Sequence, residues 1–156
     1  MKTKHKQLLE EWEGLKELPN NLLKELTKGA YFKTGSDAFF GFGSYYEGSN
    51  DYDFVVLVPS MLDMADILIK NGYGFGCSEF YDGNSYPVYC KVPVITKPVN
   101  FILVENKDVY DAWQFATDTM VSMCRYDVMN EKARNDRQFR VNVFSYLREL
   151  YKEVIK

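Results

Sequence analysis

Apolar residues recur at spacings of three and four over residues 3–28, with an interruption at Pro19. This period matches one face of an α-helix, whereas proline interrupts a helix because it lacks the N–H donor. The pattern therefore predicts two short helices within residues 1–30. Gly29 stops the second helix, and residues 31–37 are expected to form a connector with a glycine and a serine at its turn.

Short apolar runs in the middle of the chain predict a β-sheet. Their lengths, aromatic content and alternation are typical of strands. Strands are expected over residues 38–42, 51–58, 86–92 and 99–104. Residues 73–85 are rich in glycine, tyrosine, aspartate and asparagine, which predicts a weak or irregular strand that ends in a turn. The core of the sheet should therefore lie within residues 38–104.

Helical periodicity returns between and after these strands. Ser60 and Asp63 form a capping-box pattern ahead of a predicted helix over residues 61–70. Asn106 is placed to cap a second helix over residues 107–126, and a last helix is expected over residues 130–155. The predicted fold class is α+β, a small mixed sheet with flanking helices. The domain organisation is one domain over 1–156, with N-terminal helices in 1–30, the sheet core in 38–104 and C-terminal helices in 106–156.

Composition limits the cellular compartments and the classes of partner that fit this chain. A net charge of −3 and a pI near 5.3 give no global field that favours nucleic acid. The three cysteines are odd in number and form no CxxC pair, which argues against a disulfide framework or a zinc site. No apolar stretch reaches the roughly 20 residues needed to span a bilayer. We expect a cytoplasmic protein without a membrane partner.

Two carboxylates open the strand predicted over residues 51–58. Asp51 and Asp53 are one residue apart, so both side chains point to the same face of a strand. Such a pair suits Mg²⁺, which binds proteins through one or two carboxylates together with substrate phosphates. The alternative is that the two acids belong to a solvated turn at the rim of the sheet.

The residues before these two acids indicate more specifically what the acids bind. Gly43-Ser44 followed by Asp51-x-Asp53 on an apolar strand resembles the signature of the DNA polymerase beta-like nucleotidyltransferase superfamily, over residues 38–104. The resemblance implies that Gly43 and Ser44 hold the phosphates of a nucleoside triphosphate. It also implies that Asp51 and Asp53 hold Mg²⁺, or Mn²⁺ in its place, while a nucleoside monophosphate passes to an acceptor.

The family's third carboxylate has no counterpart here. The matching position in the strand over residues 99–104 is Asn100, and an amide cannot act as a general base, although its carbonyl can still ligate or orient. Asn100 is thus either a degenerate ligand or a buried asparagine bonded to neighbouring backbone. Glu79 and Glu105 are substitute acids that spacing alone does not favour.

Basic residues on the last predicted helix are candidates for binding the triphosphate. Arg137 and Arg140 share a broad face of that helix and could reach the phosphates if it packs beside the strands. The alternative is a solvated face whose charges pair along the helix. The short chain, Asn100 and the helical tail most resemble small nucleotidyltransferase-like proteins carried by bacteriophages, which implies the host cytoplasm.

Three functional hypotheses follow. The first is a nucleotidyltransferase-like protein in which Asp51, Asp53 and Asn100 form the catalytic site and the acceptor is a protein or an RNA. The second is a catalytically degenerate protein of this fold that binds nucleotide or a protein partner without turnover. The third is a structural module that uses its aromatic surface. The sequence leaves the nucleotide, the acceptor and the oligomeric state open.

Overall fold

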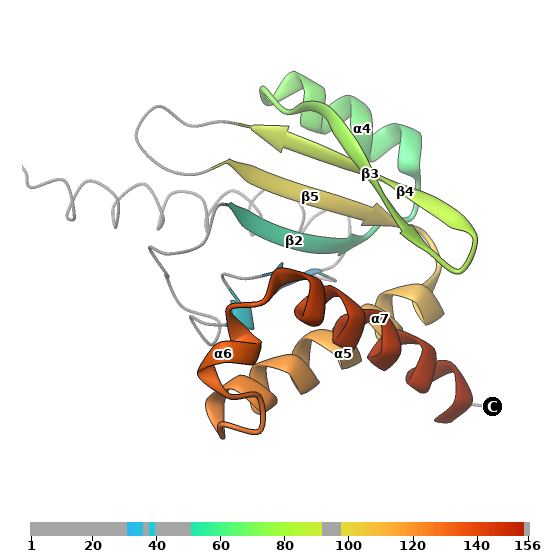
Figure 1. The fold of residues 1–156 in the computed structure, drawn as a ribbon. Coiled ribbons are helices and arrows are strands. Elements are labelled where there is room, and N and C mark those ends of the chain that lie inside the picture. Colours follow the sequence, from blue (N-terminus) through green and yellow to red (C-terminus); the bar gives the residue numbers. More distant parts are fainter. Residues whose placement is uncertain (1–30, 36–37, 40–50, 92–97, 155–156) are drawn as a thin grey trace, which may run out of the picture.

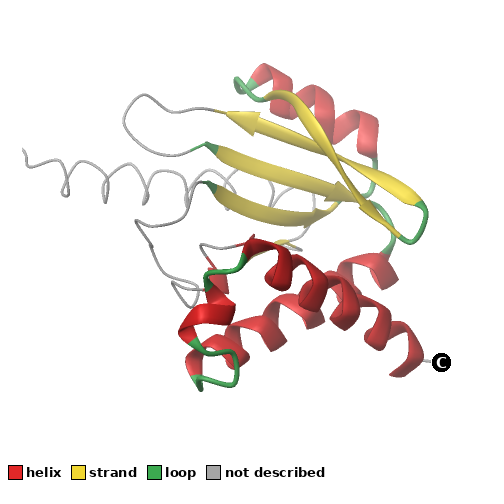
Figure 2. Cartoon of the chain, in the orientation of Figure 1, coloured by secondary structure: helices red, strands yellow, loops and turns green. Residues whose placement is uncertain are grey.

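A computed structural model describes residues 31–35, 38–39, 51–91 and 98–154 of the chain. The described strands are β1 (Tyr31–Thr34), β2 (Tyr52–Leu57), β3 (Gly74–Tyr81), β4 (Asn84–Lys91) and β5 (Val99–Val104). The described helices are α4 (Met61–Lys70), α5 (Lys107–Arg125), α6 (Glu131–Arg134) and α7 (Arg137–Val154). The fold is mixed α+β, with helices on both sides of one sheet (Figures 1 and 2).

The five strands form one mixed sheet in the order β1-β2-β5-β4-β3. β2 and β5 are parallel neighbours, and the other pairs are antiparallel. In Figure 1, α4 covers one face of this sheet while α5, α6 and α7 lie on the other side. Because β2 and β5 start at the same edge, residues at their first positions lie side by side.

One face of the sheet is a continuous apolar core under α4. Alternate residues of β2 and β5 point into it, as period-two strands require. The buried members are Tyr52, Phe54, Val56, Val99, Phe101 and Leu103, packed with Met64 and Leu68 of α4. Burying a side chain as large as Phe101 contributes about 1.5–3 kcal/mol.

The opposite face is apolar only toward the far ends of β2 and β5. Val55, Ile102 and Val104 pack there against Trp113 of α5. A third cluster joins α5 to α7 through Met120 and Leu147 and the residues around them. The starts of the same strands carry polar residues on this face, and these form the site described below.

Four predicted elements are confirmed almost to the residue. They are β2, α4, β5 and α5. Their boundaries are set by local chemistry: Ser60 Oγ accepts from the Asp63 N–H at 3.3 Å, and Asn106 Oδ1 accepts from the Asp108 N–H at 2.7 Å. β4 begins two residues before the predicted strand at 86–92.

The predicted start of the sheet is wrong. Residues 31–34, expected to be a connector, form β1, which pairs antiparallel with β2. Ala38 and Phe39, expected in a strand over 38–42, are helical and buried beside α5 and α7. Their packing against helices overrides the strand preference of the aromatic run. Residues 40–42 and the helices predicted within 1–30 lie outside the described residues.

Two further predictions change in detail. The weak strand expected within 73–85 is β3, a full partner of β4 with an irregularity between Phe75 and Cys77. The last helix, predicted as one piece over 130–155, is divided into α6 and α7. Asp136 lies between them and its carboxylate accepts from the Phe139 N–H at 3.1 Å, which starts a new helix.

Within the described part of the chain, none of the helices combines the length and the apolar character that crossing a bilayer requires.

Candidate functional site

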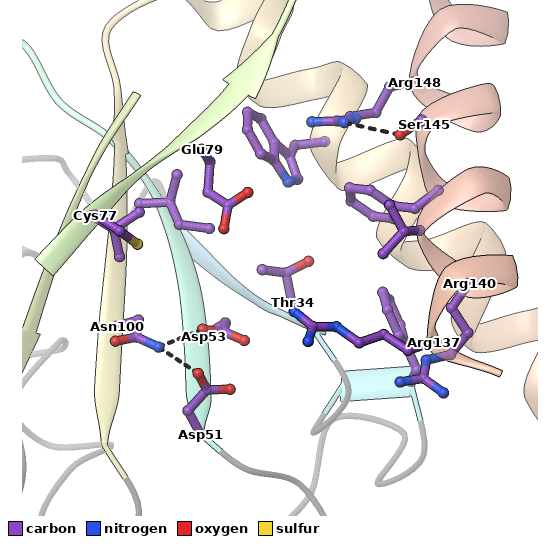
Figure 3. A pocket seen from close by; sticks show the side chains of 17 residues that line it. Thr34, Asp51, Asp53, Cys77, Glu79, Asn100, Arg137, Arg140, Ser145 and Arg148 are labelled. Carbon is purple, nitrogen blue, oxygen red and sulfur yellow. Dashed lines mark hydrogen bonds between the residues drawn. The ribbon is translucent and has the colours of Figure 1, made fainter. Parts of the chain in front are cut away.

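Three polar side chains meet where β2 and β5 begin. Asp53 lies opposite Asn100 in the parallel register, and Asp51 precedes β2 on the same face. The Asn100 Nδ2 donates to Asp51 Oδ2 at 2.7 Å and to Asp53 Oδ1 at 2.9 Å (Figure 3). One amide therefore holds both carboxylates together.

This arrangement crowds negative charge. Burial, and next the negative charge of Asp51, raise the pKa of Asp53 to about 8, while the hydrogen bond from Asn100 opposes the shift. At pH 7 Asp53 therefore holds a proton in most molecules.

Gly35 allows this carboxylate to approach the backbone. Thr34, at the end of β1, lies opposite Asp53, and Gly35 follows with φ +77°. Residues other than glycine rarely adopt this conformation, and a Cβ on Gly35 would overlap Asp53 Oδ2. A glycine at this position is thus required by both the turn and the site.

The acids line a cavity of about 420 Å³ between the sheet and α7. Ligand sites of small molecules have volumes of this order, roughly 300–1,000 Å³. The sheet side of the cavity carries Asp51, Asp53, Asn100, Cys77 and Glu79, and the helix side carries Arg137, Arg140, Ser145 and Arg148 (Figure 3). An acidic wall thus faces a basic one across the cavity.

The three arginines of α7 differ in their partners. Arg137 forms no hydrogen bond or ion pair with another residue that the structure describes, whereas Arg140 donates to the backbone carbonyl of Arg134. The Arg148 guanidinium lies 4.7 Å from the centre of the Trp113 ring and 4.8 Å from that of Tyr81. Burial lowers the pKa of Arg148 below its ordinary value. Arg137 is therefore the cation best placed to bind an incoming anion.

The structure brings five of the predicted site residues into this one cavity: Asp51, Asp53, Asn100, Arg137 and Arg140. Gly43 and Ser44 lie outside the described residues. The alternative in which Asn100 bonds neighbouring backbone does not hold in the described part of the chain, because its amide donates to the two carboxylates.

Gly35 and Arg148 line the cavity without a predicted site role. The sequence predicts Gly35 only as a turn residue of a connector, and it gives no signal for Arg148. Gly-Ser occurs three times in this part of the chain, at 35–36, 43–44 and 48–49. Sequence alone does not choose among the three, since β1 is recognised only by its pairing with β2.

The donor set is small for a cation site. No cluster of three or more histidine, cysteine, aspartate or glutamate side chains suited to a metal ion is found among the described residues. The hydrogen-bonded group at the starts of β2 and β5 offers two carboxylates and one amide.

Neither a protein-family model nor a curated protein matches this chain.

Proposed function

We propose that this chain is a nucleotidyltransferase-type protein that binds a nucleoside triphosphate together with Mg²⁺. The observation that carries the proposal is the convergence of Asp51, Asp53 and Asn100 from adjacent parallel strands, facing Arg137 and Arg140 across the cavity. Carboxylates suit the cation and arginines suit the phosphates, and phosphoryl chemistry needs both.

The order of elements around the acids supports the same assignment. Strand β1, Gly35 with its positive φ, the helical Ala38 and Phe39, Asp51, and Asp53 in β2 occur in this order along the chain. We therefore assign the phosphate-holding turn to Gly35, followed in sequence by Ser36, instead of Gly43-Ser44. Gly35 lines the cavity and lies against Asp53.

The residues present fit a divalent cation. Asp51 and Asp53 would hold it, since a positive charge there would offset both the burial and the negative charge of Asp51 that raise the pKa of Asp53. Asn100 would present its carbonyl oxygen instead of its NH₂ after a half-turn of the amide, which exchanges donor and acceptor. Mn²⁺ accepts the same oxygen donors. The bound cation would neutralise phosphate charge in the reaction.

The reaction proposed is transfer of a nucleoside monophosphate to a hydroxyl of a protein or an RNA. The acceptor oxygen attacks the α-phosphorus, the bond to the bridging oxygen breaks, and pyrophosphate leaves. Arg137 and Arg140 would bind the charged phosphates from α7. Asn100 cannot take the acceptor's proton.

Asn100 also favours a second candidate function. Asn100 occupies the position of the family's third acid. Its amide donates to both aspartates and so stabilises the two carboxylates without adding a negative charge. A protein of this kind would bind the triphosphate, or sense it, without turnover.

Nucleotide-dependent stabilisation tests the proposal. Thermal unfolding is measured with ATP, GTP, CTP or UTP, each with and without Mg²⁺, for the natural chain and for Asp51→Asn/Asp53→Asn. A ligand at 100 times its Kd stabilises the native state by about 2.7 kcal/mol. We expect at least one triphosphate to stabilise the natural chain only with Mg²⁺, and the double variant to lose this effect.

The matched control is Asp63→Asn/Asp66→Asn, which removes two carboxylates from α4 on the other face of the sheet. It should respond to nucleotide as the natural chain does. Equal stabilisation of the site variant and the natural chain would show that nucleotide binds elsewhere.

A further inference from the structure

Glu79 is a carboxylate that the hairpin of β3 and β4 brings to the cavity. It lies in β3, two strands away from Asn100 in the order β5-β4-β3. In Figure 3 its side chain points into the space between Asp53 and Arg148, and it lines the same cavity as both. The cavity thus holds a third acid, supplied by a different strand from the one that carries Asn100.

No described residue forms a hydrogen bond or an ion pair with the Glu79 carboxylate, although the charges of Arg148 and Arg137 act on it. The other substitute acid, Glu105, lies past the opposite end of β5 and accepts the Met61 N–H at 3.2 Å. Of these two acids, Glu79 alone is available to a ligand in the cavity.

The hairpin is fixed to α7 just beyond Glu79. The Tyr81 hydroxyl donates to the Arg148 carbonyl oxygen at 3.3 Å, and Lys152 Nζ lies 2.6 Å from Asp82 Oδ1. The Arg148 guanidinium stacks over the Tyr81 ring. These contacts join the β3–β4 hairpin to α7, so the strand that carries Glu79 is connected directly to the helix on the opposite side of the cavity.

We propose that Glu79 is the general base that takes the proton from the acceptor hydroxyl; this rests on the function proposed above. The Glu79 carboxylate removes the proton as the acceptor oxygen forms its bond to the α-phosphorus. The α–β bridging bond breaks and its electron pair leaves with pyrophosphate. Water then removes the proton from Glu79, so the net products are the nucleotidylated acceptor, pyrophosphate and a proton.

The surroundings of Glu79 strengthen it as a base. Burial raises its pKa above the ordinary value, and the negative charge of Asp51 adds to the rise, while Arg148 and Arg137 oppose it. A stronger base accepts a proton more readily, provided that it remains ionised. The amide of Asn100 cannot accept the acceptor's proton, whereas the carboxylate of Glu79 in the β3–β4 hairpin can.

Transfer and binding are measured separately to test this role. Each α-³²P-labelled triphosphate is incubated with Mg²⁺ and a nucleotide-depleted cell lysate, and label is counted in small-molecule, RNA and protein fractions. The Kd of the same triphosphate is measured by calorimetry. We expect Glu79→Gln to lower the initial transfer rate by about 10²–10⁴-fold. Its Kd should stay the same or fall, since the variant removes a negative charge from the cavity. Glu79→Asp should recover part of the rate.

Glu105→Gln is the matched control, because it makes the same change outside the cavity and should keep the natural rate. The assignment of Glu79 is overturned if Glu79→Gln transfers at the natural rate. It is also overturned if the natural chain binds the triphosphate and labels none of the fractions; binding lost in Asp51→Asn/Asp53→Asn would then still support the nucleotide site.

Discussion

The two faces of the sheet use the same strands for different purposes. Under α4, every second residue of β2 and β5 is apolar and buried, from Tyr52 to Leu103. On the cavity side, the intervening residues change from polar at the strand starts to apolar at the strand ends, as Asp53 and Val55 show. Strand alternation therefore separates the core from the site within one short sequence.

This difference predicts which property of the protein a substitution on each face would affect. The α4 face depends on packing, so its residues affect the free energy of unfolding. The cavity face places charges close together, so we expect its residues to affect the pH dependence of stability and the binding of the proposed ligand. Substitutions on alternate residues of one strand should therefore have different consequences.

The largest expected effect is on the α4 face. Phe101 is 1% exposed, and its ring lies 5.0 Å from that of Tyr73 and 5.6 Å from that of Phe54. Phe101→Ala should lower the free energy of unfolding by about 3–5 kcal/mol, because it opens a cavity in the core. Urea denaturation measures this loss.

Phe75→Ala is the control, since Phe75 is 62% exposed on the edge strand β3. It should change the free energy of unfolding by only about 0.5 kcal/mol. Equal losses in the two variants would contradict the division of the sheet into a packed face and a site face.

A pH-dependent effect is expected on the cavity face. The pKa of Asp53 is about 8 in the folded chain, above its ordinary value of 3.8. Between these two values the folded state binds more protons than the unfolded state, so the contribution of Asp53 to stability falls as the pH rises. The slope reaches at most about 1.4 kcal/mol per pH unit.

Urea denaturation at pH 5, 6, 7 and 8 should therefore show a flatter pH dependence for Asp53→Asn than for the natural chain. Mg²⁺ should flatten the profile of the natural chain as well, by favouring the ionised carboxylate. Asp66→Asn, on the surface of α4, should keep the natural slope. An unchanged slope in Asp53→Asn would show that other groups cause the pH dependence.

Of the three site and core substitutions, Asn100→Asp should have the smallest effect on stability. It replaces the amide that bonds both aspartates by a third carboxylate, which should lower the free energy of unfolding by about 1–3 kcal/mol without Mg²⁺. Mg²⁺ should restore this stability. Transfer of label should increase, because the new carboxylate at position 100 can also accept the proton of the acceptor hydroxyl. Thermal unfolding with and without Mg²⁺ measures the first effect, and equal stability in both would refute it.

Local signals predicted much of the fold. Caps at Ser60 and Asn106 and the alternation in β2 and β5 are properties of neighbouring residues, so the sequence suffices for them. β1 was missed because a strand of four residues has little pattern of its own and depends on its pairing with β2. The helical Ala38 and Phe39 were missed for a similar reason, since their packing partners lie in distant helices.

The candidate site was predictable only in part. Asp51, Asp53 and Asn100 follow from strand register, and Arg137 and Arg140 required the supposition that α7 packs beside the strands. Glu79 and Arg148 could not be placed, because their approach depends on how the β3–β4 hairpin meets α7. That Gly35 lies beside Asp53 follows from the pairing of β1 with β2 and could not be inferred from the Gly-Ser dipeptides in the sequence.

The parallel pairing of β2 with β5 also has a consequence for biosynthesis. Asp53 and Asn100 are 47 residues apart, and the arginine wall follows only with α7. Closing such long loops slows folding, because chain entropy is lost before the contacts form. On the ribosome, the acids emerge well before the helix that faces them. The nascent chain therefore acquires the arginine wall of the cavity after the acidic wall, when α7 has been translated.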